Sequence, residues 1–455
     1  MSSLHTSGAI ALTMKDRLRS VRAAAAGNML EWFDWTLYGI FSTYLAANFF
    51  DNSNPTSALL STMAVFAGGF IARPIGGFFF GRLGDRVGRR LTLLVTMMTL
   101  SFTTLAIALV PTYDQIGAWA SVILLLLRLL QGLAHGGEAG VSYTYVAEIA
   151  PKERRGLWTS VVYVSVMIGV MGATATAALL SNLLGSATMN EWGWRIGFGL
   201  GSLLALYVLV LRRFAKETDV FAEQKPEQHQ KATGSKMSAV DRAKVYKACI
   251  YIFLLSACTN VVYYTWVTFA PINAITLKGM DPGGAYTASL LAQLMVLFFL
   301  VLFGHLSDKV GRRPMTMALG VAVILLIVPI QMILTDQPWT LFVAQGLGLT
   351  AWALAVGFYP ALMAELAPTF ARARVVGVMT SLAAGVFGGT APYLYTWLTS
   401  IGLASVFYAY LASLAILTII VGFKMKETRG MDLNEDLHQS ALPSEQPQPS
   451  SAASN

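Results

Sequence analysis

Gly81-Arg82-Leu83-Gly84-Asp85-Arg86-Val87-Gly88-Arg89-Arg90 is a short charged motif that the chain carries twice. The second copy is Gly304-His305-Leu306-Ser307-Asp308-Lys309-Val310-Gly311-Arg312-Arg313. Each copy lies between two long apolar runs, and an aspartate, a glycine and a pair of arginines keep the same spacing in both. Because the copies stand roughly half the chain apart, the sequence predicts two similar halves joined in tandem.

The apolar content of the chain predicts a membrane protein. Of the 455 residues, 55% are hydrophobic and only 12% are charged, which leaves too little polar surface to cover a soluble chain. The apolar residues come in runs of about 20, the length that crosses a bilayer as a helix. We therefore expect an all-α membrane protein with twelve transmembrane helices in two pseudo-symmetric six-helix bundles. The predicted helices cover roughly residues 28–50, 58–80, 91–111, 119–143, 157–181, 193–211, 247–271, 285–306, 315–335, 339–363, 374–398 and 402–423.

The remaining segments set the predicted domain boundaries. Residues 1–20 form a polar N-terminal arm, and residues 213–246 form a cytoplasmic linker rich in Lys, Glu, Gln and Ser. The two helical bundles then span residues 21–212 and 247–426. The Ser-, Pro- and Gln-rich residues 427–455 are expected to be a disordered cytoplasmic tail.

The net charge of +8 indicates orientation and not a nucleic-acid partner. Most of the 32 Lys and Arg residues fall in the arm, the linker, the tail and alternate loops, whereas the other loops carry acids such as Asp51 and Asp281. By the positive-inside rule, both termini are expected to lie in the cytoplasm, and we expect a multi-pass protein of the cell membrane. Cys249 and Cys258 are nine residues apart on one predicted helix, so they face apart and indicate neither a disulfide nor a metal site.

Together with the repeated motif, four further stretches resemble a known transporter family. They are Gly27-Asn28-Met29-Leu30-Glu31-Trp32-Phe33-Asp34, Arg73-Pro74-Ile75-Gly76-Gly77, Arg128-Leu129-Leu130-Gln131-Gly132 with Gly136-Gly137-Glu138, and Trp192-Gly193-Trp194-Arg195. Residues 20–430 resemble the major facilitator superfamily, and within it the metabolite:proton symporters, the group of α-ketoglutarate, citrate, shikimate and proline/betaine permeases. His135 departs from the pattern, because such proteins usually carry a small or apolar residue there.

The resemblance implies a proton-coupled symporter that imports a small organic acid, such as a di- or tricarboxylate or related carboxylate, by alternating access. It implies no enzyme activity, cofactor or metal, and the expected partners are a small organic anion, protons and membrane lipid, with the monomer as the working unit. Two alternatives stay open: a proton symporter of a zwitterionic osmolyte such as proline or betaine, and a drug or metabolite antiporter. Such antiporters resemble one another in a Gly-Pro motif on the fifth helix, where this chain has Gly169 and Gly172 without a proline. An ATP-driven enzyme is excluded, because the chain has no phosphate-binding Gly-x-x-x-x-Gly-Lys-Ser/Thr loop.

Asp34 and Arg128 are the predicted centre of proton coupling. Arg128 sits deep in an apolar run, where a charge costs at least ~2.5–3.5 kcal/mol and normally faces the bundle interior with a partner. Asp34 is the expected partner, since related sugar:proton symporters carry an Asp and an Arg at matching positions. If Arg128 turned toward an anionic substrate, Asp34 would lose its counter-charge and take up a proton, so substrate and proton binding would favour each other. The alternative is an ion pair that only fixes helix packing.

Glu31 and Glu138 are two further candidates for proton coupling. Glu31 lies one helical turn before Asp34 on the same face. Glu138 follows a pair of glycines, where helices approach closely, which suggests an interior network. Each also has a plainer interpretation, namely solvation near the cytoplasmic interface for Glu31 and a structural role for Glu138.

Three other intramembrane residues are assigned mainly structural roles. His135 would titrate near neutrality if hydrated, but a lone intramembrane histidine is more often a hydrogen-bonded packing residue. The family's pattern favours structural roles for Arg73 and Arg195, with Arg195 also a candidate for an extracellular gate.

Polar and aromatic side chains of both halves are candidates for lining a substrate cavity. The second half has almost no charge within its apolar runs, so an anion would meet one cation together with hydroxyl and amide donors. Aromatic residues are also typical of membrane-interface belts, which is the alternative for each tyrosine. The candidate substrate-binding residues are Arg128, Tyr38, Gln131, His135, Tyr143, Asn260, Tyr263, Tyr264, Gln293 and Tyr359.

The charged repeats are expected to act as gates. Asp85 can pair with the following arginines and with the N-terminus of a neighbouring helix, latching the two halves while the protein faces outward, and Asp308 should do the same. A second repeated motif places Glu148 and Glu365 before a basic cluster in each half. The alternative is a solvated loop that only sets topology. The gating candidates are Gly81, Asp85, Gly88, Arg89, Arg90, Asp308, Gly311, Arg312, Arg313, Glu148 and Glu365.

Overall fold

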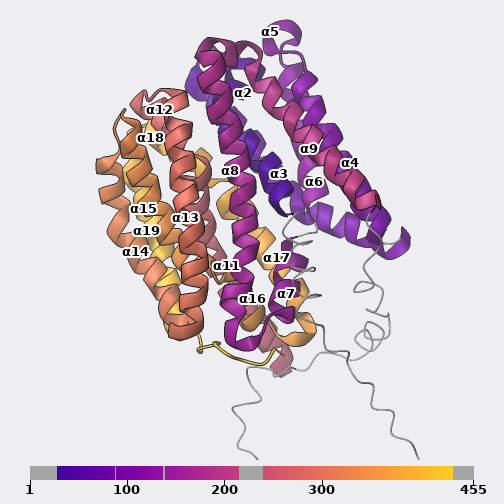
Figure 1. The fold of residues 1–455 in the computed structure, drawn as a ribbon, viewed down its shortest axis with the longest axis vertical. Coiled ribbons are helices and arrows are strands. Elements are labelled where there is room, and N and C mark those ends of the chain that lie inside the picture. Colours follow the sequence, from indigo (N-terminus) through magenta and orange to yellow (C-terminus); the bar gives the residue numbers. More distant parts are fainter. Residues whose placement is uncertain (1–27, 88, 137–138, 215–238, 434–455) are drawn as a thin grey trace, which may run out of the picture.

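The computed structural model describes residues 28–87, 89–136, 139–214 and 239–433, and the regular structure within them is helical throughout (Figure 1). In the first half, residues 28–40 are helical and are followed by α2 (Ser42–Phe49), α3 (Pro55–Val87), α4 (Arg89–Leu109), α5 (Tyr113–Ile116), α6 (Trp119–His135), α7 (Ala139–Ile149), α8 (Arg155–Thr188) and α9 (Trp194–Phe214). The second half holds α11 (Ala239–Tyr263), α12 (Ala270–Lys278), α13 (Pro282–Val310), α14 (Arg312–Ile333), α15 (Pro338–Val356), α16 (Tyr359–Leu366), α17 (Arg372–Ala383), α18 (Ala391–Ser400) and α19 (Ala404–Lys424).

The predicted all-helical membrane fold is confirmed. Eight helical stretches in the described part of the chain are long and apolar enough to cross a membrane. Val95–Leu109 and Trp119–His135 are shorter apolar helices. Helices lie over each of the twelve predicted ranges, while the number of membrane crossings stays a prediction.

Several predicted helices are interrupted in the structure. The predicted helix over residues 339–363 folds as α15 and α16, with a break at Gly357 and Phe358. Pro360 falls in the first turn of α16, where its missing N–H costs nothing and its fixed φ suits the start of a helix. Between α11 and α12, the π-helical turn Tyr264–Thr268 widens the helix and places Pro271 in the first turn of α12.

The two halves pack in matching ways. In the first half α3 lies beside α6 and α4 beside α9, and in the second half α13 lies beside α15 and α14 beside α19. These pairs occupy corresponding places in the two halves, as the repeated sequence motif predicts. Across the halves, α8 runs along α13 and α7 lies against α17 (Figure 1). The predicted boundaries of the bundles stay a prediction, because residues 215–238 of the linker lie outside the described residues.

Glycines bring α3 and α6 into backbone contact. A Cβ atom at Gly76 would lie 2.0 Å from the carbonyl oxygen of Leu133, and one at Gly132 would lie 2.0 Å from the carbonyl oxygen of Gly69. Only glycine fits at such distances, and small residues are the usual way for membrane helices to approach closely. The contact sets Arg73 of α3 near Arg128 of α6, and both lie against the ring of Trp35.

The outer surface of the helices is apolar and their interior carries polar groups. Large apolar side chains stand exposed on several helices, among them Phe102, Leu183 and Met332. Conversely, Arg128 and Gln131 are fully buried. This arrangement suits a bundle surrounded by lipid, with charge directed toward the interior.

Candidate functional site

Arg128 on α6 lies at the centre of a buried charged site. Its side chain is fully buried, and its guanidinium carbon lies 4.1 Å from the ring centroid of Tyr38 and 4.2 Å from that of Trp35. Its Nη1 donates to Oε1 of Gln131 at 2.7 Å. Its Nε and Nη2 find no hydrogen-bond partner among the described residues. Buried donors without partners are costly, so this edge of the guanidinium group is ready for a ligand.

Asp34 is joined to Arg128 through Gln131. Thr104 Oγ1 donates to Oδ1 of Asp34 at 2.5 Å, and Gln131 Nε2 donates to Oδ2 at 3.2 Å. Gln131 Nε2 also donates to Thr104 Oγ1 at 2.9 Å. The sequence predicts a direct ion pair between Asp34 and Arg128, and the structure differs because Gln131, one turn along α6 from Arg128, stands between them. The two residues share one network, as expected, but through an amide.

Glu31 and His135 form a second titratable pair. Glu31 Oε1 lies 3.3 Å from Nδ1 of His135, and both side chains are buried. The imidazole of His135 meets the ring of Trp35 edge-on, with centroids 5.4 Å apart. Its Nε2 has no hydrogen-bond partner within the described part of the chain. Glu31 is therefore not solvated at an interface, and Glu138 lies outside the described residues.

Arg73 on α3 belongs to the same centre, which the sequence analysis missed. Its guanidinium carbon lies 3.9 Å from the centroid of Trp35 and 4.5 Å from that of Phe70. Its Nε and Nη2 are buried and have no hydrogen-bond partner among the residues described. The signal was available, because Arg73 stands in an apolar run just as Arg128 does, and a charge is equally costly there.

Tyrosines of both halves meet near this centre. The hydroxyls of Tyr143 and Tyr163 lie 3.0 Å apart, and the ring of Tyr163 packs edge-on against Tyr359 and Trp352. The ring of Tyr264 packs edge-on against Phe70 with a centroid distance of 5.3 Å. Of these residues, Tyr143, Tyr264 and Tyr359 are predicted lining residues, and they are thus brought to the interface between the halves.

Two predicted lining residues make local contacts within the second half, and a third packs against the first half. Asn260 Nδ2 donates to the carbonyl of Ser256 one turn earlier, at 2.7 Å. Gln293 is fully buried, and its Nε2 donates to Ser289 Oγ at 3.2 Å and to the carbonyl of Val267 at 3.5 Å. It thereby helps to satisfy the π-helical turn. Tyr263 packs edge-on against Trp32 of the first half, with centroids 5.2 Å apart.

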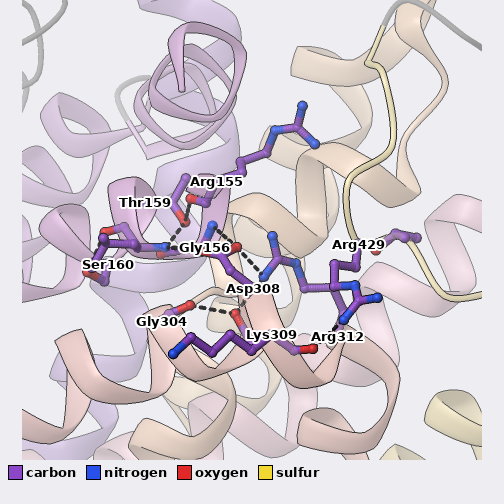
Figure 2. A network of polar contacts seen from close by, with 12 residues as sticks. Arg155, Gly156, Thr159, Ser160, Gly304, Asp308, Lys309, Arg312 and Arg429 are labelled. Carbon is purple, nitrogen blue, oxygen red and sulfur yellow. Dashed lines mark hydrogen bonds and ion pairs between the residues drawn. The ribbon is translucent and has the colours of Figure 1, made fainter. Parts of the chain in front are cut away.

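Asp308 joins the two halves at the end of the molecule that carries Arg155, Arg312 and Arg372, here called the basic end. Its carboxylate pairs with Arg312 Nη1 at 2.9 Å. It also accepts the backbone N–H groups of Gly156 at 2.8 Å and Leu157 at 2.9 Å, in the first turn of α8 (Figure 2). This is the geometry expected of a latch, an acid paired with a nearby arginine and with the N-terminus of a helix from the other half.

Glu365 ties the same two halves through a buried carboxylate. It is fully buried, and it contacts Arg155 of the first half at 2.9 Å and Arg312 of the second half at 3.3 Å. In the reverse direction, Glu148 of the first half pairs with Arg372 of the second half at 3.0 Å. The second repeated motif therefore supplies one acid of each half to an arginine of the other half.

The remaining gating candidates have mixed outcomes. Gly311 ends α13 with φ at 113°, a conformation that favours glycine. Arg313 does not contact Asp308; its Nε donates to the carbonyl of Gly422 at 3.1 Å. Of the first copy, Gly88 lies outside the described residues. Nothing further is described of Gly81, and the side chains of Asp85, Arg89 and Arg90 lie outside the described part of the chain.

Residues just after α19 lie against the basic end. The carboxylate of Glu427 accepts the backbone N–H groups of Arg312 at 2.8 Å and Arg313 at 3.0 Å, which open α14. Met431 offers its carbonyl to Arg155 Nη1 at 3.0 Å. The expected disorder from residue 427 onward is thus wrong for residues 427–433, because their carboxylate and carbonyl groups find partners there.

These observations define a helical membrane protein of two similar halves, with a buried charged centre in the first half and buried ion pairs that join the halves at one end. The family model of the major facilitator superfamily matches residues 24–392. Among characterised proteins, the alpha-ketoglutarate permease of Escherichia coli (strain K12) is 36% identical over 434 residues, 93% of this chain and 98% of that protein. The proline/betaine transporter of the same strain is 31% identical over 426 residues, 91% of this chain and 84% of that protein.

This chain belongs to the major facilitator superfamily, as its repeated motifs indicated. A solved structure of a D-xylose-proton symporter has the same fold, with a TM-score of 0.70 over 91% of this chain and 99% of that one, at 20% sequence identity. The family is one of transporters, and the chain is a multi-pass membrane protein.

Proposed function

We propose that this chain is a proton-coupled symporter that imports a small organic acid by alternating access, as a monomer whose basic end faces the cytoplasm. The observation that carries the proposal is the buried Arg128, whose Nε and Nη2 are unpartnered in the described part of the chain. A carboxylate would accept charge-assisted hydrogen bonds from both donors. The likeness to an alpha-ketoglutarate permease supports a carboxylate substrate.

The network around Gln131 supplies the coupling between substrate and proton. Arg128 donates to Oε1 of Gln131, whose Nε2 donates to Asp34. An anion that draws Arg128 away also releases Gln131, and Asp34 then loses the donors and the positive charge that stabilise its ionised form. Protonation of Asp34 and substrate binding therefore favour each other, and the same coupling free energy acts in both directions.

The latch at the basic end supports alternating access. Its buried contacts between Asp308, Glu365 and the arginines hold the two halves together at this end. Opening toward the cytoplasm requires these contacts to break, and a two-state contact of this kind lets one bundle rock against the other.

Uptake into proteoliposomes tests the proposal. With an alkaline interior, we expect the wild type to accumulate labelled alpha-ketoglutarate and to lose this accumulation when a protonophore is added. Asp34→Asn should lose accumulation but keep exchange of labelled for unlabelled substrate across the membrane. Asp336→Asn is the matched control, since Asp336 is exposed between α14 and α15. Full accumulation by Asp34→Asn would remove Asp34 from the coupling step.

A zwitterionic osmolyte is the second candidate substrate. The likeness to a proline/betaine transporter favours it, and so does an aromatic cluster in which Trp352 packs against Tyr163 and Tyr263. Aromatic faces bind quaternary ammonium groups. Uptake under the same gradient decides between the two substrates. If labelled betaine accumulates and labelled alpha-ketoglutarate does not, the substrate is the osmolyte.

A further inference from the structure

We propose that Arg73 and Arg128 together form a two-point receptor that selects dicarboxylates. This inference rests on the proposed function and adds the substrate class to it. Each guanidinium group takes one carboxylate of the same small molecule, and the ring of Trp35 holds both groups in place.

The two guanidinium groups lie close to each other. The guanidinium carbons of Arg73 and Arg128 are 3.9 Å and 4.2 Å from the centroid of the same Trp35 ring. The two carbons are therefore separated by no more than the sum of these two distances. Arg73 is 8% exposed and Arg128 is 0% exposed. Two like charges at such a distance repel strongly when they are shielded from water. An anionic substrate bound between the two arginines would relieve this repulsion.

Both arginines present the same free edge. In each, the unpartnered donors in the described structure are Nε and Nη2, the adjacent pair along one side of the guanidinium plane. This is a pair that a carboxylate can accept bidentately. Structural arginines normally have these donors satisfied, because a buried donor without a partner is costly, and more so when the group is charged. Two such edges in one centre match a molecule with two carboxylates.

Tyr264 offers a contact from the second half. Its hydroxyl is buried without a hydrogen-bond partner among the described residues, and its ring packs edge-on against Phe66 and Phe70, which lie beside the two arginines. A diacid held by the first half would thus also contact the second half, so binding would favour the closure of the two bundles around it.

The same geometry disfavours the alternative substrates. A monocarboxylate would satisfy one arginine and leave the other unpaired. A zwitterion would bring its cationic group toward the second arginine, and this repulsion acts against betaine and proline. Arg73 is therefore the residue that separates diacids from both classes.

The test compares a diacid with its own half-ester. We expect the purified full-length protein to bind alpha-ketoglutarate about 10- to 100-fold more tightly than its gamma-monomethyl ester, measured by calorimetry, because the ester loses one charge-assisted pair. In Arg73→Gln this preference should fall to within about threefold, through weaker binding of the diacid alone, whereas Arg128→Gln should weaken both ligands. Arg374→Gln, at an exposed arginine of α17, is the control and should keep the wild-type preference.

Each outcome bears on one of the two proposals. Equal affinity of the wild type for diacid and half-ester overturns the two-point receptor, and so does an equal loss of both ligands in a folded Arg73→Gln protein. The wild-type comparison holds even if that variant does not fold, and Arg73→Lys, which keeps the charge but not the edge, should then show an intermediate preference. A wild type that binds neither ligand contradicts the proposed function itself.

Discussion

Gln131 connects the two charges on which coupling depends. The sequence identifies Arg128 because a cation deep in an apolar run needs an interior partner, and it identifies Asp34 on another predicted helix. Whether these side chains touch depends on how far apart the helices stand, which no sequence pattern gives. The structure places an amide between them, and an amide can both donate and accept.

Replacing Gln131 by leucine should separate binding from coupling. Leucine fills a similar volume but cannot form hydrogen bonds to Arg128 and Asp34, so a movement of Arg128 would no longer change the surroundings of Asp34. We expect Gln131→Leu to bind alpha-ketoglutarate with an affinity within about threefold of the wild type. Accumulation driven by the pH gradient should fall by about tenfold or more, because the loss of one buried hydrogen bond costs about 1–3 kcal/mol. Binding by calorimetry and uptake in proteoliposomes measure the two effects.

The control is Gln337→Leu, which changes an exposed glutamine at the start of α15 and should leave both measurements as they are. Unchanged accumulation in Gln131→Leu would show that Asp34 senses the substrate by another route. Loss of binding together with accumulation would make Gln131 a substrate contact instead of a link.

Much of the site could be predicted from residue types and depth, and the rest depends on packing. The sequence indicates Asp34, Arg128 and Glu31 because a charged side chain within the membrane is costly and is usually functional. It assigns Arg73 to structure, since only the α3–α6 glycine contact brings that residue to the ring of Trp35. Trp35 itself carries no signal, because one aromatic residue in an apolar run looks like any other.

At the scale of helices, Asp308 caps a helix of the other half. It lies near the C-terminal end of α13 and accepts the N–H groups that open α8. The repeated motif predicts this contact because an aspartate at the end of one helix can meet the positive N-terminus of another. It does not predict Glu427, which caps α14 in a similar way and which follows no repeat.

Asp308→Asn should loosen the seam between α8 and α13. The amide keeps the shape of the side chain but loses the charge that pairs with Arg312 and the N-terminus of α8. A cysteine placed at Ser160, a buried residue of α8 near this contact (Figure 2), should react with a maleimide at least about tenfold faster in the variant. The background protein would carry Cys249→Ser and Cys258→Ala, so that the new thiol alone reacts.

The same cysteine in an Asp336→Asn background serves as the control, since Asp336 is exposed in the loop between α14 and α15, at the end of α13 opposite Asp308. Equal labelling rates in the Asp308→Asn and Asp336→Asn proteins would mean that Asp308 sets topology without holding the halves together.

For the whole molecule, the repeats predict the architecture but not the state in which it rests. Two copies of a motif are enough to predict two bundles with matching helix pairs, and the structure has them. The ionic contacts at the basic end, by contrast, depend on side chains that meet only when the halves close, such as Arg155 with Glu365. A sequence can specify both open and closed forms, so it cannot say which one is populated.

The charges of the buried centre also constrain how many protons accompany a diacid. In the described part of the chain, Glu31 and Asp34 stand opposite Arg73 and Arg128, so the ionised centre is neutral when His135 is uncharged. A dicarboxylate adds two negative charges, and unpaired charge in a low-dielectric interior is costly. Protonation of both acids restores neutrality. We therefore expect two protons to accompany each diacid in an electroneutral cycle.

This stoichiometry is measurable at equilibrium. Each proton contributes 1.36 kcal/mol per pH unit, so two protons should raise the accumulation ratio of alpha-ketoglutarate about 100-fold per pH unit, independently of the membrane potential. Glu31→Gln should reduce this to about tenfold and make accumulation depend on the potential, whereas Glu191→Gln, at an exposed carboxylate, should keep the wild-type slope. A wild-type slope of about tenfold per pH unit would contradict the charge balance, because one of the two acids would then stay ionised beside the bound diacid.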